Sequence, residues 1–195
     1  ALRAKNDGDT FSMSKLEKVH SQVKKMTTLI NGFLNTSSFE AGKIYLNEQT
    51  FEINDLLNEV VEEVMLITAN HNFVVMPSPK VSVKADRDKI GQVINFLTNA
   101  VKYSPKGKNI DISCKESNGN IQVSVKDQGI GIKPQDQEKL FDRYYRIESV
   151  QNQTISGFGL GLYLSAEIIH RHKGKVWVES EMGKGSTFYF SLPLN

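Results

Sequence analysis

Two asparagines and a lysine recur at helical spacing and could bind a metal–phosphate complex. Asn95, Asn99 and Lys102 are three and four residues apart, so on a helix they share one face. An amide oxygen of Asn99 would ligate Mg²⁺, and nucleotide phosphates would complete the shell, because Mg²⁺ takes few protein ligands. The alternative is a solvated polar face of a helix.

A carboxylate close to two glycines could recognise a base. Asp127 ends a strand-like run, and Gly129 and Gly131 allow the backbone to turn tightly beside it. If Asp127 is buried, its carboxylate would accept a hydrogen bond from an exocyclic amine, which would select adenine over guanine. The alternative is a plain turn.

Two further segments could bind phosphate. Gly157, Gly159 and Gly161 alternate with bulky residues just before a helical pattern, and a glycine-rich loop at a helix N-terminus suits phosphate. The spacing is neither that of a P-loop nor the Gly-x-Gly-x-x-Gly dinucleotide fingerprint. In Phe141–Arg146, aromatic and basic residues interleave, and Arg146 could clamp a γ-phosphate. The alternative there is a helix end docked by its aromatic side chains.

Periodicity predicts the elements that position these groups. Strands are expected at Thr50–Ile53, Val81–Lys84, Asn109–Glu116, Asn120–Asp127, Lys175–Glu181 and Ser186–Leu192. Helices are expected from Asn54, as a capping residue, to about Thr68, from Lys89 to Lys102 after an Asp86 N-cap, and from Leu160 to His172. Pro134 opens a short helix in the otherwise irregular stretch 128–156. Because these elements mix without regular βαβ alternation, we expect an α+β layer sandwich.

The N-terminal part predicts a bundle or coiled-coil helix that starts at Met13. Its apolar residues alternate at spacings of three and four: Leu16, Val19, Val23, Met26, Ile30 and Phe33. Such a helix is not stable alone, so it needs a partner helix from this chain or from another copy.

Bulk properties exclude several classes of protein. The chain has 195 residues, enough for one packed domain and an appendage. A net charge of +2 gives no electrostatic case for nucleic acid, and no apolar run approaches the roughly 20 residues that span a bilayer. The single cysteine, Cys114, cannot form an internal disulfide, and its strand-like setting predicts a small core or edge residue and not a reactive one.

The order of these motifs, together with the glycines of Gly183–Phe188, resembles the catalytic and ATP-binding domain of bacterial sensor histidine kinases of two-component systems. The resemblance runs from about Thr50 to the C-terminus. Met13 to about Ser38 resembles the second helix of the family's dimerisation and phosphoacceptor module, and SSFEAGKIYL resembles its junction with the kinase domain. The resemblance implies a helical segment at 1–42 and a catalytic domain at 43–195. The fold implied for the catalytic domain is an α/β sandwich of the histidine kinase, gyrase and chaperone ATPase type (the Bergerat fold).

The resemblance also implies roles for individual residues. Asn95, Asn99 and Arg146 would be catalytic, and Asn99 would ligate Mg²⁺. A mobile lid would run from about Lys133 to Ser156. The cofactor-binding set would be Asn95, Asn99, Lys102, Tyr103, Asp127, Gly129, Gly131, Ile132, Arg146, Gly157, Phe158, Gly159, Leu160, Gly161, Leu162 and Thr187. Phe158 departs from the family, which more often has a small or hydroxylated residue there.

The implied activity is transfer of the ATP γ-phosphate to a histidine of the dimerisation domain, for relay to an aspartate of a response regulator. Asn95 stands where related ATPases of the same fold carry a glutamate that activates water, and an amide cannot act as that base. This favours a protein-histidine kinase over the two alternatives, a hydrolytic ATPase and a non-catalytic regulatory module. We expect a cytoplasmic location, with a homodimeric parent that could be anchored in the inner membrane.

The phosphoacceptor histidine itself is not expected in this chain. His20 lacks the acidic residue and proline of the family motif and is interpreted as a bundle histidine, and His71 does not fit. His170 and His172 end a helix, where they help to satisfy its last carbonyls. We therefore expect the first helix of the module to be missing, and the chain alone not to autophosphorylate.

Overall fold

The computed structural model describes residues 19, 22–23, 45–68, 71–94, 104, 109–147 and 159–194. The chain divides into two compact units, residues 1–44 and 45–195. In the first unit Val19, Gln22 and Val23 are helical, and the two valines are 60% and 55% exposed. The rest of the predicted apolar seam lies outside the described residues. No helix among the described residues is long and apolar enough to cross a bilayer.

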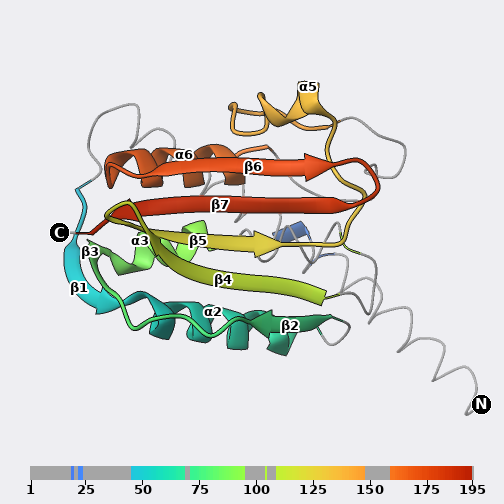
Figure 1. Cartoon of the computed structure of the whole chain (residues 1–195). Coiled ribbons are helices and arrows are strands. Elements are labelled where there is room, and N and C mark those ends of the chain that lie inside the picture. The colour runs from blue at the N-terminus through green and yellow to red at the C-terminus, as the bar shows by residue number, and fades with distance from the viewer. Residues whose placement is uncertain are drawn as a thin grey trace, which may run out of the picture. The chain divides into compact units, whose positions relative to one another are not determined.

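The second unit is built on a mixed sheet. Its described strands are β2 (Asn72–Val75), β4 (Asn109–Ser117), β5 (Asn120–Lys126), β7 (Gly185–Pro193) and β6 (Lys175–Glu181), in that spatial order. β2 pairs parallel to β4, and the other neighbours pair antiparallel. A separate antiparallel pair, β1 (Glu48–Glu52) with β3 (Ser82–Asp86), lies at one end of this unit (Figure 1).

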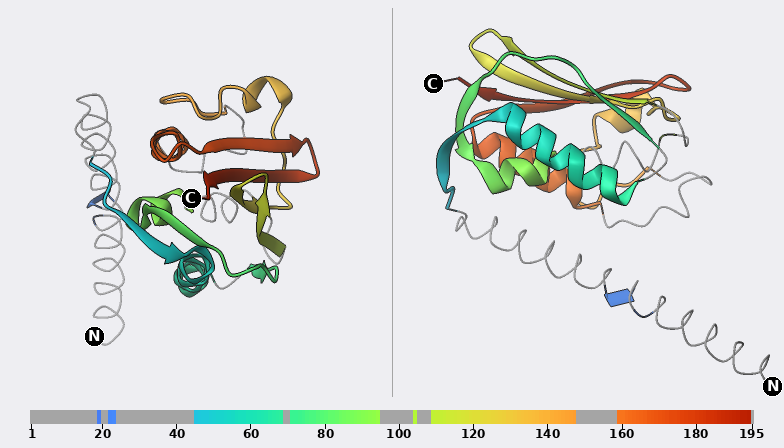
Figure 2. Two further views of the ribbon diagram at one scale, coloured as in Figure 1. Left: turned by 60° about the vertical axis from the view of Figure 1, so that its left-hand side comes forward. Right: turned by 90° about the horizontal axis from the view of Figure 1, so that it is seen from below.

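Helices cover one face of the larger sheet. They are α2 (Ile53–Ile67), α3 (Arg87–Val93) and α6 (Gly161–Arg171), which Figure 2 shows side by side beneath the strands. The short helix α5 (Pro134–Gln137) lies instead beside the edge strand β6. This is the expected α+β layer sandwich.

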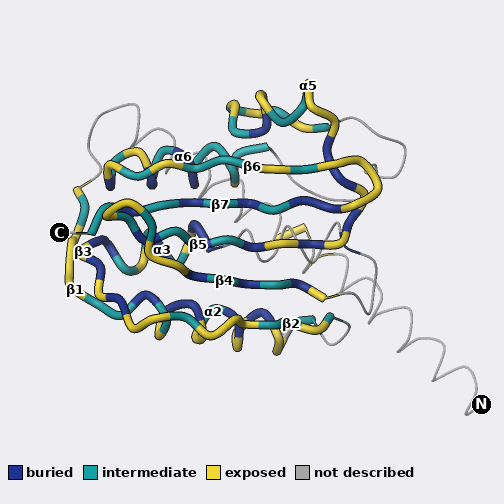
Figure 3. The backbone as a smooth tube through the Cα atoms, viewed as in Figure 1, coloured by how far each residue is buried: buried dark blue, intermediate teal, exposed yellow. Residues whose placement is uncertain are grey.

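Strand alternation decides which side chains enter the core. In β4, Ile110, Ile112 and Cys114 are buried, and in β5 the buried side chains are Ile121, Val123 and Val125. The intervening residues lie on the helix-free face and are partly or fully exposed, so buried and exposed positions alternate along the strands (Figure 3). Burial raises the pKa of the Cys114 thiol to about 11, which confirms the predicted core cysteine.

Most of the expected elements in the described ranges are confirmed within one or two residues. The β4–β5 turn places Asn118 and Gly119 at φ +52° and +70°, the left-handed pair that tight hairpins need. Asp86 caps α3 as predicted, because its side chain accepts the Lys89 N–H at 3.1 Å. The predicted continuation of this helix to Lys102 lies outside the described residues.

Two expectations differ from the structure. Asn54 does not cap α2, because Glu52 occupies the N-cap position and Asn54 lies inside the first turn. The Asn54 side chain instead donates to the Pro79 carbonyl at 2.6 Å and accepts from the Ser78 hydroxyl at 2.8 Å. Strand β2 was not expected. Its four residues are too few for a clear alternation, and its pairing with β4 is a contact between distant parts of the chain.

Candidate functional site

Asp127 is a buried carboxylate at the point where β5 leaves the sheet. Its side chain is 3% exposed. Oδ1 accepts two backbone N–H groups, from Gly129 at 2.7 Å and from Ser186 at 3.2 Å. The Asp127 N–H in turn donates to the Ser186 carbonyl at 2.8 Å. The carboxylate is thus fixed between its own turn and the start of β7, and Oδ2 accepts neither of these two bonds.

The Asp127 carboxyl is removed from water, which disfavours its charged form. Burial raises the pKa of the Asp127 carboxyl, and the hydrogen bonds from the Gly129 and Ser186 amides partly oppose that rise. A buried, partly satisfied carboxylate gains from a further hydrogen-bond donor. The site therefore suits a neutral ligand group that carries N–H, such as an amine of a base.

Glycines allow the turn after β5 to lie directly against the β6–β7 hairpin. Gly131 has φ +74°, and a Cβ there would lie 2.1 Å from the Glu181 carbonyl oxygen. Gly185 has φ +94°, and its Cβ would lie 2.2 Å from the Asp127 carbonyl oxygen. The Gly183 N–H also donates to the Ile130 carbonyl at 2.8 Å. Gly131 and Gly185 are therefore required by close backbone approach, not only by turn geometry.

Strand register separates two neighbouring residues of this hairpin. Ser186 is buried on the side of Asp127, whereas Thr187 is half-buried on the opposite face of β7. The structure therefore does not bring Thr187 together with Asp127, and Ser186 occupies that place. Sequence reasoning missed Ser186, although the alternation of the strand from Ser186 to Leu192 was a usable signal.

The glycine-rich segment reaches the N-terminus of α6 as expected. Leu160 is the N-cap residue, Gly161 starts the helix, and Leu162 follows in its first turn, while Gly157 and Phe158 lie outside the described residues. Gly159 has φ +69°, and a Cβ there would lie 2.7 Å from the Tyr145 carbonyl oxygen. The first turn of α6 has no acidic residue, which leaves its positive end suited to an anion.

Tyr144 and Tyr145, within the expected lid, are joined to this helix start and to α5. The Tyr144 N–H donates to the Gly159 carbonyl at 3.0 Å, and Tyr144 has φ +65°, an unusual value for a bulky residue. The Tyr145 hydroxyl donates to Asp136 at 2.8 Å, which ties the segment to α5. Arg146 is exposed. The Tyr144–Gly159 bond therefore joins two described residues that lie on either side of 148–158 in the sequence.

The polar residues predicted to bind metal and phosphate lie outside the described residues: Asn95, Asn99, Lys102 and Tyr103. The described part of the chain stops just before them, because α3 ends at Val93 and Ile94 is its C-cap residue. Among the described residues there is no group of three or more His, Cys, Asp or Glu side chains that could hold a metal ion. Their assignment as ligands stays a prediction.

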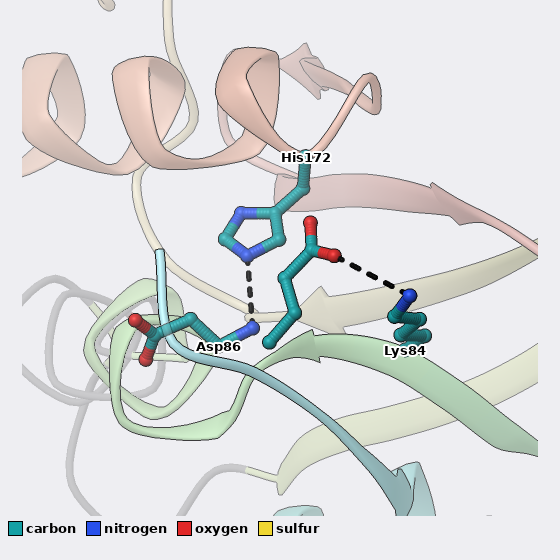
Figure 4. Close-up of polar contacts among 4 residues, drawn as sticks. Lys84, Asp86 and His172 are labelled. Carbon is teal, nitrogen blue, oxygen red and sulfur yellow. Dashed lines mark hydrogen bonds and ion pairs between the residues drawn. The ribbon is translucent and has the colours of Figure 1, made fainter. Parts of the chain in front are cut away.

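His172 is a buried histidine with both ring nitrogens engaged, so it does not resemble a phosphoacceptor. His172 is 6% exposed, accepts the Asp86 N–H on Nε2 at 3.0 Å, and has Nδ1 2.8 Å from the Ile168 carbonyl. Since Nε2 is the acceptor, Nδ1 carries the proton and donates. Figure 4 shows His172 pointing from the end of α6 to Asp86, beside the 4.0 Å ion pair of Lys84 with Glu48. The predicted role of His172 at a helix terminus is confirmed, and His20 lies outside the described residues.

Comparisons with known proteins agree with this geometry. Residues 85–195, more than half of the chain, match the family described as histidine kinase-, DNA gyrase B-, and HSP90-like ATPase. The sensor histidine kinase WalK of Bacillus subtilis is 34% identical over 178 residues, which is 89% of this chain and 29% of WalK. The chain thus spans less than a third of that relative.

Two solved structures share the fold at useful identity. Full-length ShkA in complex with AMPPNP has a TM-score of 0.75 and 26% identity, over 86% of this chain and 35% of ShkA. The histidine kinase ThkA in complex with response regulator protein TrrA has a TM-score of 0.66 and 25% identity, over 87% of this chain and 49% of that chain. The chain belongs to the histidine kinase, DNA gyrase B and HSP90-like ATPase family, and it carries the ATP-binding catalytic domain of a sensor histidine kinase.

Proposed function

We propose that this chain binds ATP with Mg²⁺ and transfers the γ-phosphate to a histidine of a dimerisation domain, for relay to an aspartate of a response regulator. The observation that carries the proposal is the orientation of Asp127. Two backbone amides hold Oδ1, so the carboxylate is fixed before any ligand arrives. Oδ2 would accept the adenine amino group, which inosine and guanine lack at the same ring position.

The phosphates would lie at the N-terminus of α6. Gly159 and Gly161 keep the backbone free of side chains there, and the helix dipole favours negative charge. Asn99 would ligate Mg²⁺, with Asn95 assisting. Lys102, Tyr103 and Arg146 would contact the triphosphate or the ribose. Leu160 and Leu162 would line the glycine-rich segment at the start of α6. The metal would neutralise phosphate charge, as is usual in phosphoryl transfer.

Catalysis by this chain would consist mainly of positioning. No carboxylate stands at position 95 to activate water, since that residue is an asparagine. The γ-phosphate would then wait for a protein nucleophile, and the residues around it would hold it in line and screen its charge. This separates the proposal from a hydrolytic ATPase of the same fold.

The proposed partners agree with those found in complexes of two structural neighbours. ShkA was solved in complex with AMPPNP, and ThkA was solved in complex with response regulator protein TrrA. We assign to this chain the same classes of partner, a nucleotide and a receiver domain, in a cytoplasmic setting. The division into a helical segment at 1–42 and a catalytic domain at 43–195 belongs to the same proposal.

A transfer assay tests the proposed activity. The chain is incubated with γ-labelled ATP and Mg²⁺, alone and together with a separate phosphoacceptor helical hairpin of a sensor histidine kinase. Label on the added hairpin alone is the expected result. Label on the chain by itself would place the acceptor among its own histidines, and release of inorganic phosphate without labelled protein would identify an ATPase.

A binding experiment tests the base pocket. In Asp127→Asn the two amides still bind Oδ1, so Nδ2 replaces Oδ2 and faces the adenine amine donor to donor. We expect ATP affinity to fall by about tenfold or more, and ITP, whose ring carries a carbonyl at that position, to lose much less. Asp111→Asn in β4 is the control for the same change of charge. An unchanged ratio of ATP to ITP affinity would reject the pocket.

A further inference from the structure

A single hydroxyl joins the turn that follows Asp127 to the start of β7. Ser180 of β6 accepts the Ile132 N–H at 2.8 Å, donates to the Gly185 carbonyl at 2.9 Å, and lies 2.9 Å from the Ser186 hydroxyl. Ile132 belongs to the turn that follows Asp127, and Gly185 and Ser186 begin β7. No sequence motif marked Ser180, because its neighbours in this network come from two other segments, the turn after β5 and the start of β7.

The directions of these hydrogen bonds follow from counting protons. A serine hydroxyl has one proton, and the Ser180 proton goes to the Gly185 carbonyl. In the pair with Ser186, Ser186 must therefore be the donor. Ser180 accepts two bonds and donates one, which uses its full capacity. Ser186 is held at its side chain by Ser180 and at its amide by Asp127.

Gln137 extends the same network to the root of the lid. Its Nε2 donates to the Ile132 carbonyl at 2.8 Å and to the Ser180 carbonyl at 2.9 Å. Gln137 is the last residue of α5, which begins the segment expected to cover the nucleotide. The Gln137 amide therefore ties α5 to Ile132 and to Ser180, which are already joined by the Ser180 hydroxyl.

We propose that Ser180 is a positioning residue for base selectivity, and that Gln137 supports it from α5. The inference rests on the proposed function, since it assumes that Asp127 reads the base. Without the Ser180 hydroxyl, the Ser186 hydroxyl and the Ile132 N–H both lose their acceptor. Ser186, whose amide binds Oδ1 of Asp127, is then held less firmly, so the carboxylate is less restricted to the orientation that presents Oδ2 to an adenine amine.

The test is the ratio of ATP to ITP affinity, measured by titration calorimetry on the whole chain. For Ser180→Ala we expect the preference for ATP to fall about tenfold, the change that follows the loss of one well-placed hydrogen bond. Ser113→Ala is the matched control, because Ser113 and Ser124 form a hydroxyl pair of 2.7 Å in the same sheet, on β4 and β5. Ser180→Thr keeps the hydroxyl and should retain the preference.

A second variant decides the question if Ser180→Ala does not fold. Gln137→Glu places an oxygen against two carbonyls and should lower the same ratio, whereas Gln135→Glu, exposed on the same helix, should leave it unchanged. Equal losses of ATP and ITP affinity would show a purely structural role and overturn the inference. If Asp127→Asn changes the ratio while the Ser180 and Gln137 variants do not, only this inference fails. If Asp127→Asn leaves it unchanged, the proposed pocket fails first.

Discussion

Asp86 donates its backbone N–H to Nε2 of His172 across 86 residues of sequence. The side chain of Asp86 caps α3 by accepting the Lys89 N–H at 3.1 Å, and its Oδ2 accepts the Asn47 N–H at 3.0 Å. His172 satisfies the Ile168 carbonyl near the end of α6. Asp86 thus joins the start of α3, the end of α6 and the segment before β1 through separate hydrogen bonds, and α3 packs against α6.

His172→Ala should therefore destabilise the domain. The Asp86 N–H loses its buried acceptor, which costs about 1–3 kcal/mol. The Ile168 carbonyl loses the imidazole donor and keeps only the backbone N–H of residue 172. We expect a total loss of about 2–4 kcal/mol in the free energy of unfolding, measured by urea denaturation. The exposed neighbour His170 is the control, and His170→Ala should change stability by no more than about 0.5 kcal/mol. Equal effects of the two variants would contradict the proposed junction.

Gly131→Ala should be far more damaging than the same change at Gly183. Both glycines have positive φ, +74° and +79°, so both alanines are strained by about 1–2 kcal/mol. Only at Gly131 would the new Cβ also meet backbone, at 2.1 Å from the Glu181 carbonyl, while nothing lies within 4 Å of a Cβ at Gly183. We expect thermal unfolding to show a further loss of about 1–3 kcal/mol for Gly131→Ala. Similar melting temperatures would show that the turn moves away from the hairpin at little cost.

Asp127 should lower the stability of the folded domain at neutral pH while it strengthens ATP binding. Its native pKa is raised by burial, so the folded state holds the proton more tightly than the unfolded chain. The protonated Asp127 carboxyl therefore contributes stability below its ordinary pKa of 3.8, and this contribution is lost as pH rises through the raised native pKa. At neutral pH the ionised side chain therefore destabilises the domain, and Asp127→Asn should raise the melting temperature while it weakens ATP binding.

The pH dependence supplies the control for that prediction. As pH falls through the native pKa of Asp127, the wild-type carboxyl becomes neutral and the stability advantage of Asp127→Asn should shrink. Melting temperatures of both proteins between pH 7 and the onset of acid unfolding measure the difference. An advantage that does not change with pH would assign it to packing and not to charge.

Cys114 should resist thiol reagents in the folded protein. Its pKa is raised by burial to about 11, so almost no thiolate exists at pH 8, and access is blocked as well. We expect labelling by a disulfide reagent at pH 8 to be at least about a hundredfold slower than in denaturant. The neutral thiol contributes stability below its ordinary value of 9.0, and this is lost as pH rises toward 11. Rapid labelling of the native chain would contradict the buried position.

Local patterns were sufficient for much of this domain. Alternation and the Asn118-Gly119 turn predicted the β4–β5 hairpin, and 3.6-residue periodicity predicted α6, because each depends on residues that are neighbours in sequence. Asp127 and its glycines were also recognisable, since a carboxylate at a strand end followed by Gly-x-Gly is a contiguous pattern. The assignment to sensor histidine kinases rested on several such patterns in order.

Other features depend on contacts between distant segments, which no local pattern specifies. Strand register decided that Ser186 and not Thr187 lies beside Asp127, and β2 formed only because it pairs with β4. The Ser180 hydroxyl contacts both Ile132 and Gly185 because the turn after β5, strand β6 and the start of β7 meet there. Sequence alone determined the chemistry available to this protein, whereas tertiary packing decided which polar atoms meet, because hydrogen bonds act over about 3 Å and require the folded chain to supply both partners.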